Sequence, residues 1–73
     1  MIHINEYINK VHEELNTYDY DLLIAGYDPK FIAKGMSQVM ATVYPLNWSY
    51  RLCALCILGI TYEMIAENKK GVN

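Results

Sequence analysis

The sequence contains little cysteine, glycine and proline, and each shortage excludes a class of protein. Its two cysteines allow at most one internal disulfide, which excludes a disulfide-rich scaffold. Its four glycines stand apart from one another, which excludes a glycine-rich loop that cradles phosphate. Only two prolines interrupt the chain, and no repeat or linker is visible. We therefore expect one compact domain over residues 1–73.

Charge is also sparse. Charged residues make up 19% of the chain and the net charge is −2, which is too little positive charge for bulk-charge binding to nucleic acid. Six acids and one base fall in residues 1–28, whereas five bases and two acids fall in residues 29–73. The uncharged run 52–62 is eleven residues long. A bilayer span needs about 20 residues, so we expect no membrane span.

Apolar residues make up 53% of the 73 residues, and the chain carries seven tyrosines. A domain of this size buries only about 60% of its unfolded surface, so it often needs a second chain for stability. The N-terminal stretch lacks the pattern of a signal peptide, and we expect a reducing, cytoplasmic location. Residue types with AT-rich codons are frequent, which hints at a bacterial or phage genome.

The spacing of apolar residues predicts an all-α fold, a small bundle of three main helices. We expect these helices over residues 2–17, 29–44 and 48–70, with a short extra helical turn near 20–25. The apolar stripe of the first helix comprises Ile4, Ile8, Val11, Leu15 and Tyr18. In the turn, Leu22, Leu23 and Ile24 are expected to be buried. The inward residues of the second helix are expected to be Phe31, Ile32, Met36, Val39, Met40 and Val43.

Local signals set several helix ends. Asp28 followed by Pro29 is a helix start, with the acid as N-cap and proline at the first helical position. Pro45 is expected to end that helix at the preceding residue. Asn47 and Ser49 compete as the N-cap of the last helix. Gly35 lies mid-helix, where it costs about 1 kcal/mol relative to alanine, so we expect a close backbone contact with another helix there.

The last helix is apolar on every side, which is typical of a helix covered all round. Two short partner helices cannot cover it fully, so we expect it to dimerise with a second copy or to bind a foreign protein. The expected dimer interface comprises Leu52, Leu55, Cys56, Gly59 and Tyr62.

No constellation of residues indicates catalysis, a cofactor or a metal. Cys53 and Cys56 form a C-x-x-C spacing, but they lie inside an apolar helix, which should raise the thiol pKa and disfavour redox chemistry. The two histidines, His3 and His12, are nine residues apart and fall on opposite sides of a helix. The acids after residue 18 lack the remaining ligands of a calcium loop. We expect the chain not to be an enzyme.

The junction before the last helix is the expected partner-binding patch, because tyrosine, tryptophan and arginine are enriched at interface hot spots. Its members are Tyr44, Trp48, Tyr50 and Arg51. The same junction has the length of a helix-turn-helix turn, in which Ser49, Tyr50 and Arg51 would contact DNA. Only one of these residues is basic, and the isoelectric point near 5.5 argues against DNA binding.

No motif identifies a family. The favoured hypothesis is a small non-enzymatic protein-interaction module that binds and regulates or inhibits a larger protein. This hypothesis rests on an analogy with phage and mobile-element accessory proteins, which act on a host system. The alternative is a helix-turn-helix-like DNA-binding transcriptional regulator, and a small membrane-associated helical protein is the third hypothesis.

Overall fold

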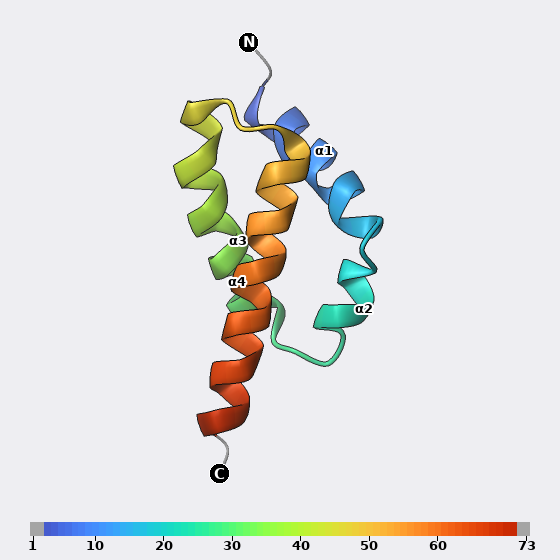
Figure 1. Ribbon diagram of the computed structural model, residues 1–73, viewed down its shortest axis with the longest axis vertical. Helices are drawn as coiled ribbons and strands as arrows, with labels where there is room; N and C mark the ends of the chain where they lie inside the picture. The colour runs from blue at the N-terminus through green and yellow to red at the C-terminus, as the bar shows by residue number, and fades with distance from the viewer. Residues whose placement is uncertain (1–2, 72–73) are drawn as a thin grey trace.

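The chain folds as an all-helical bundle, as the sequence predicts. The computed structural model describes the backbone of residues 3–71 and the side chains of residues 3–67, and this part of the chain contains no strand. The elements are α1 (Ile4–Asn16), α2 (Tyr20–Ile24), α3 (Pro29–Val43), a 3-10 turn η1 (Tyr44–Leu46) and α4 (Tyr50–Gly71). Figure 1 shows α3 on one side of α4 and α1 with α2 on the other. The extra turn near 20–25 is therefore a short helix.

The first helix begins and ends through local side-chain bonds. The Nδ1 atom of His3 accepts a hydrogen bond from the backbone N–H of Asn5 at 3.2 Å, which caps the first turn. The Thr17 hydroxyl donates to the Glu14 carbonyl at 2.6 Å, just beyond the last turn. The helix thus spans Ile4–Asn16 rather than 2–17, and residue 2 lies outside the described residues.

The buried stripe of α1 is rotated from its expected position. Val11 and Leu15 are fully buried as expected, but the third core side chain is Tyr7. Ile4 and Tyr18, the two ends of the expected stripe, are each 38% exposed. The stripe still repeats every four residues, so the helical period was right and the inward-facing residue at its N-terminal end was wrong.

The short helix α2 lies between two residues with positive φ, a backbone conformation that is uncommon for most residues. Asp19 precedes it with φ of 55°, without a side-chain capping bond, and Gly26 follows it with φ of 91°. The expected burial of all of Leu22, Leu23 and Ile24 is wrong, because Leu22 is 77% exposed while the other two are partly buried. Tyr20, only 1% exposed, is the side chain that fixes α2 to the core.

Helix α3 starts where the sequence predicts. Asp28 Oδ1 accepts from the Lys30 backbone N–H at 3.0 Å, and Pro29 occupies the first helical position. Phe31 is 40% exposed, so its expected inward position is wrong; it lies at the edge of the helix face that meets α4. Gly35 is buried, and a Cβ there would stand 2.7 Å from Met64 Sδ of α4. Gly35 does lie in close contact with another helix, but the neighbour is the Met64 side chain rather than the backbone contact that was expected.

The junction replaces the last turn of α3 with a tighter one. Helix α3 ends at Val43, and Tyr44–Leu46 form the 3-10 turn that contains Pro45. Asn47 follows with φ of 55° and so cannot begin α4. The Ser49 Oγ accepts from the Leu52 backbone N–H at 3.2 Å, which identifies Ser49 as the cap. Helix α4 therefore begins at Tyr50, two residues later than expected.

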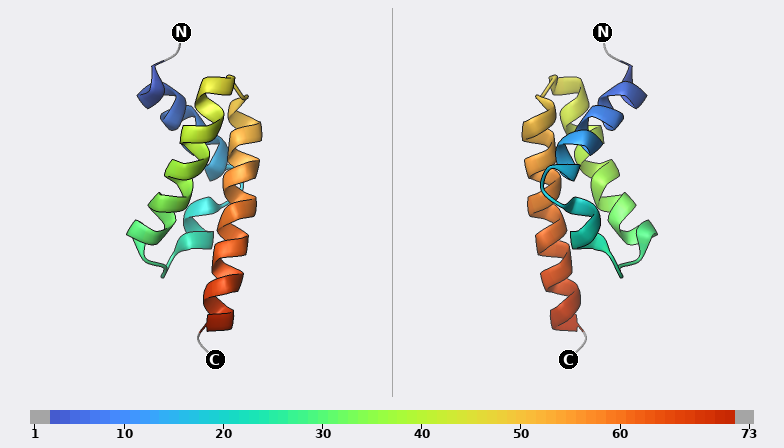
Figure 2. Two further views of the ribbon diagram at one scale, coloured as in Figure 1. Left: turned by 90° about the vertical axis from the view of Figure 1, so that its left-hand side faces the viewer. Right: turned by 90° about the vertical axis from the view of Figure 1, so that its right-hand side faces the viewer.

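Helix α4 packs into the angle between α1 and α3. Its buried residues are Cys53, Ala54, Ile57, Leu58, Thr61 and Ile65. In both views of Figure 2, α4 runs along one outer side of the molecule, and the other helices all lie on the same side of it. Within one chain, α4 is therefore buried on the side facing the bundle and exposed on the other.

Candidate protein-interaction surface

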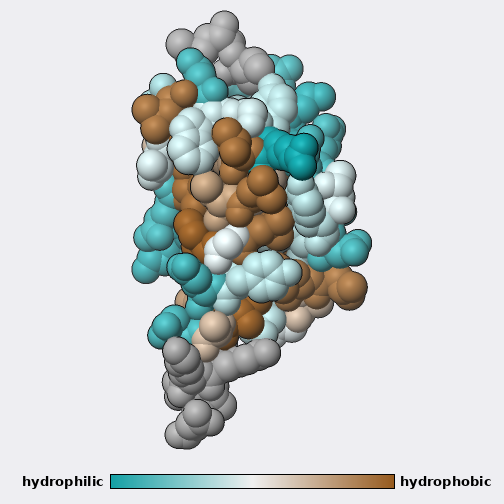
Figure 3. All heavy atoms as spheres, viewed as in Figure 1, coloured by the Kyte–Doolittle hydropathy of each residue, from teal (hydrophilic) through white to brown (hydrophobic). Residues whose placement is uncertain are grey.

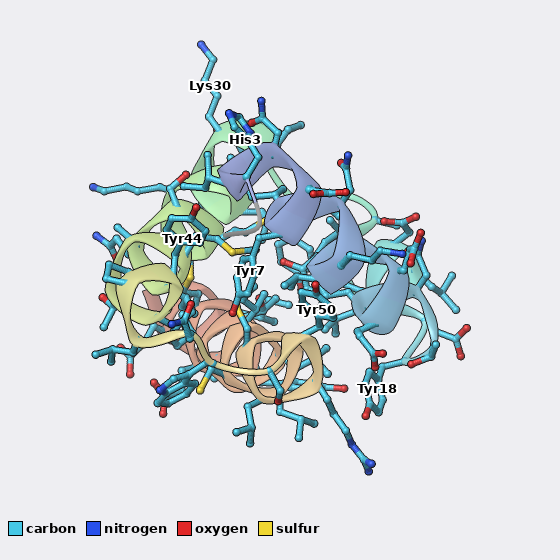
Figure 4. The ribbon with its side chains drawn as sticks, turned by 90° about the horizontal axis from the view of Figure 1, so that it is seen from above. His3, Tyr7, Tyr18, Lys30, Tyr44 and Tyr50 are labelled. Carbon is cyan, nitrogen blue, oxygen red and sulfur yellow. The ribbon has the colours of Figure 1, made fainter. Side chains whose placement is uncertain are left out.

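The four residues of the expected partner-binding patch lie at one end of the bundle, but they divide into two pairs. Tyr44 and Tyr50 are half-buried against Tyr7, with ring centroids 5.5 Å and 5.4 Å from the Tyr7 ring. Figure 4, which looks down on this end, shows Tyr7 between them. Trp48 and Arg51 are exposed. The two tyrosines thus support the junction, and the tryptophan and arginine present themselves to solvent.

A hydrogen bond from α1 fixes the backbone of the junction. The Tyr7 hydroxyl donates to the Trp48 carbonyl oxygen at 2.9 Å. Burial, with smaller contributions from Cys53 and Tyr50, raises the pKa of Tyr7 from 10.0 to about 12. The phenol therefore keeps its proton throughout the physiological range and can always donate. Sequence reasoning missed Tyr7, although its position one residue before Ile8 of the predicted stripe is a signal that could have found it.

The outer face of α4 carries the expected dimer interface. We call Leu52, Leu55, Gly59 and Tyr62 the outer face. Its three large side chains are 53%, 43% and 59% exposed, in chain order. A Cβ built at Gly59 would have no atom within 4 Å. Cys56, the fifth expected member, is half-buried beside this face. Figure 3, viewed from the side on which α4 lies in front, shows apolar atoms gathered across the middle of the surface.

Two hollows lie between α3 and α4, next to the outer face. The upper one, about 260 Å³, is almost wholly apolar and includes the Trp48 side chain. Its lining residues are Gln38, Val39, Thr42, Val43, Trp48, Cys56 and Ile60. The lower one, about 500 Å³, is lined by Phe31, Ile60, Glu63, Met64 and Glu67. Ile60 joins the two. Sequence reasoning missed this groove because it depends on the packing register of α3 against α4, which Gly35 and Met64 set.

The two cysteines of the C-x-x-C spacing lie in different surroundings. Cys53 is fully buried, with its sulfur 3.7 Å from Met40 Sδ, and burial raises the pKa of its thiol. Cys56 is half-buried, and both thiols are free. The raised pKa was the expectation from sequence, and it disfavours the reactive thiolate.

The other candidate ligands are dispersed over the surface. His3 caps α1, and His12 is exposed on the same helix. Among the described residues, no group of three or more His, Cys, Asp or Glu side chains is arranged to hold a metal ion. The exposed pair Lys10 and Glu13, 3.7 Å apart, is a surface ion pair of small energetic effect.

The junction does not resemble a DNA-reading helix pair. Helices α3 and α4 run side by side in opposite directions (Figures 1 and 2), whereas the two helices of a helix-turn-helix cross at about 90–120°. Arg51 is the only basic residue in the first turn of α4, and Leu52 and Leu55 follow it on the exposed side. The exposed chemistry at this end is aromatic and aliphatic.

Comparison with protein-family models, with curated proteins and with solved structures finds no significant match to this chain. Among the described residues, every helix is too short or too polar to cross a bilayer. The case for a function therefore depends on the surface itself, which combines an exposed tryptophan, an exposed arginine and an apolar outer helix face.

Proposed function

We propose that the chain is a small, non-enzymatic protein-interaction module that binds a larger protein and regulates or inhibits it. The observation that carries this proposal is the exposed pair Trp48 and Arg51, together with the apolar outer face of α4 that begins beside it at Leu52. Leu52, Leu55 and Tyr62 each keep about half of their side chain in water along a helix that is packed only on its other side. Contiguous exposed apolar surface of this kind, continuous with an aromatic edge, marks protein-binding sites.

The proposal assigns two roles to neighbouring parts of this surface. Trp48 and Arg51 dock the larger protein, and Tyr7, Tyr44 and Tyr50 hold them in place from beneath. The outer face associates with a second copy of the chain. The indole of Trp48 lines an apolar hollow, so a partner side chain placed there would contact both the ring and the aliphatic residues around it. The cellular setting in this proposal is the cytoplasm, and the target is a host protein acted on by a phage or mobile-element accessory protein.

Affinity capture from a lysate of the organism that encodes the chain tests the docking role. The partner it recovers is then purified, and its affinity for variants is measured. Trp48→Ala and Arg51→Ala should each weaken binding, and an anchor worth 2 kcal/mol or more corresponds to about 30-fold or more in Kd. Tyr18→Ala is the matched control, because Tyr18 is 38% exposed against 36% for Trp48 and lies away from the junction. Equal affinities for all three variants would refute the assignment.

A further inference from the structure

The outer face of α4 has the geometry of a coiled-coil seam. Leu52, Leu55, Gly59 and Tyr62 follow one another at spacings of three, four and three, and the exposed Ala66 continues the series four residues later. Alternation of three and four residues is the a/d pattern that faces a partner helix in a coiled coil, and it is narrower than a core-facing stripe. The opposite side of the helix, which includes Cys53 and Ile57, is buried against the bundle, and no described residue of the chain covers this seam.

The two mid-helix glycines differ in what explains them. Gly35 is buried, and a Cβ there would stand 2.7 Å from Met64 Sδ, so packing inside the chain explains it. Gly59 is exposed at the centre of the seam, and a Cβ there would meet nothing within 4 Å. A glycine in a helix interior costs about 1 kcal/mol relative to alanine, and no close contact with a described residue offsets that cost at Gly59. A second helix that crosses closely at this point would account for it.

The charges beside the seam favour one orientation of such a helix. Arg51 lies at the N-terminal end of the outer face, whereas Glu63 and Glu67 lie towards its C-terminal end. In an antiparallel pair of α4 helices centred near Gly59, Arg51 of each copy lies level with Glu67 of the other. In a parallel, in-register pair, Arg51 adjoins Arg51 and Glu67 adjoins Glu67. Antiparallel alignment also opposes the two helix dipoles favourably.

We propose that two copies of the chain pair through α4 in an antiparallel arrangement whose two-fold axis passes within one turn of Gly59. This inference rests on the proposed function, because it names the occupant of the same interaction surface. With the axis at Gly59, the two glycines face each other and Leu52 of one copy faces Ala66 of the other, while Leu55 and Tyr62 lie on either side of the glycines. Two-fold pairing is the commonest closed arrangement of identical chains. Figure 2 shows that α1, α2 and α3 all lie on the other side of α4, so the approach is open along the helix.

The seam is small compared with a standard interface, which usually involves about 20–30 residues on each side. We therefore expect a dimer whose population changes with concentration in the micromolar range, rather than a permanent one.

Single-cysteine cross-linking tests both the pairing and its direction. The background is Cys56→Ser, which leaves Cys53 buried and unable to cross-link. With a rise of about 1.5 Å per residue, an antiparallel pair centred near Gly59 separates the two copies of residue 52 by about 15–25 Å along the axis. A disulfide requires Cα atoms within about 7 Å. Under mild oxidation, Gly59→Cys should therefore give a covalent dimer and Leu52→Cys should not. An equimolar mixture of Leu52→Cys and Ala66→Cys chains should give the mixed dimer, because residue 66 of one copy lies level with residue 52 of the other.

The cross-linking experiment has one control variant and separate results that would overturn the pairing or its direction. Leu22→Cys, at a position 77% exposed on α2, measures cross-linking by random collision. Efficient cross-linking of Leu52→Cys to itself would overturn the antiparallel arrangement, and cross-linking of Gly59→Cys no faster than Leu22→Cys would overturn the pairing. If that second result appears while Trp48→Ala still weakens capture of the larger protein, the pairing fails and the proposed module stands. If Gly59→Cys cross-links but Trp48→Ala changes nothing, the docking role fails instead.

Discussion

The buried hydrogen bond between α2 and α4 gives the sharpest test of how the bundle is held together. The Tyr20 hydroxyl lies 3.2 Å from Thr61 Oγ1, and the Thr61 hydroxyl donates to the Ile57 carbonyl at 2.7 Å. Because the threonine has one proton and uses it on that carbonyl, Tyr20 must be the donor in the first bond. Both side chains are almost fully buried, at 1% and 3% exposure.

Because Tyr20 is the donor, removing the Thr61 hydroxyl and removing the Tyr20 hydroxyl should cost different amounts of stability. Thr61→Val removes the acceptor and leaves the Tyr20 hydroxyl buried without a partner, which should cost about 1–3 kcal/mol. Tyr20→Phe removes the donor while Thr61 keeps its bond to the carbonyl, which should cost about 0.5–1.5 kcal/mol. In the double variant, no donor is left unpaired. Its loss should therefore be smaller than the sum of the two single losses by about 1 kcal/mol.

Urea unfolding of the parent, the two single variants and the double variant measures these losses of stability. Unfolding is followed by far-ultraviolet circular dichroism at low protein concentration. Tyr18→Phe, at an exposed position, serves as the control and should stay within about 0.5 kcal/mol of the parent. If the two single effects add to within about 0.3–0.5 kcal/mol in the double variant, Tyr20 and Thr61 are not coupled and the reasoning is refuted. A Tyr20→Phe loss larger than that of Thr61→Val would contradict the donor assignment.

Three further predictions concern other parts of the molecule. Because the folded-state pKa of Tyr7 is raised from 10.0 to about 12, its contribution to stability is complete below about pH 10 and declines as pH rises through 12. The free energy of unfolding, measured against pH, should therefore fall by about 2–3 kcal/mol over this range. Tyr7→Phe should flatten this part of the pH profile. A thiol reagent should label half-buried Cys56 in the folded protein and buried Cys53 only upon unfolding, as mass spectrometry of the labelled peptides will show, and equal labelling rates would contradict the packing. Gly59→Ala should stabilise the dilute monomer against urea by up to about 1 kcal/mol. Gly35→Val should destabilise it by about 1–3 kcal/mol, because the new side chain displaces Met64. A loss of stability in Gly59→Ala together with a gain in Gly35→Val would contradict the placement of these glycines.

The features that the sequence predicted well are those set by local chemistry. The Asp28–Pro29 start of α3 depends on one side-chain bond and a fixed φ angle, so neighbouring residues determine it. The end of α3 at Pro45 follows from the same kind of constraint, to within one residue. The elevated pKa of Cys53 was also predictable, because an apolar surrounding can be inferred from the residues beside it.

The features that the sequence did not predict depend on packing between distant segments. Burial of Tyr20 instead of Leu22 follows from the hydroxyl partner that Thr61 offers, 41 residues away. Burial of Tyr7 similarly depends on the Trp48 carbonyl. The groove beside Phe31 and Ile60 exists because Gly35 lets Met64 approach, which fixes the register of α3 against α4. No property of a single helix contains this information.

The near-uniform apolar character of α4 explains why its exposed side was difficult to assign. Periodicity alone cannot separate its faces when apolar side chains occur on all of them. The structure separates them: Cys53 and Ile57 face the bundle, while Leu52 and Leu55 face solvent. The surface that remains uncovered is the reason for regarding this chain as a binding module.

Sedimentation equilibrium of the unmodified chain, over concentrations from low to high micromolar, tests the central claim that the outer face of α4 binds a second copy. If the chains pair, the average mass should rise from 8.4 kDa towards twice that value as concentration increases. We also expect that Gly59→Arg, which places a bulky charged side chain in open space on the monomer, keeps its helical content and remains at 8.4 kDa. A mass of 8.4 kDa for the unmodified chain at every concentration, or an unchanged dimer in Gly59→Arg, would contradict the account.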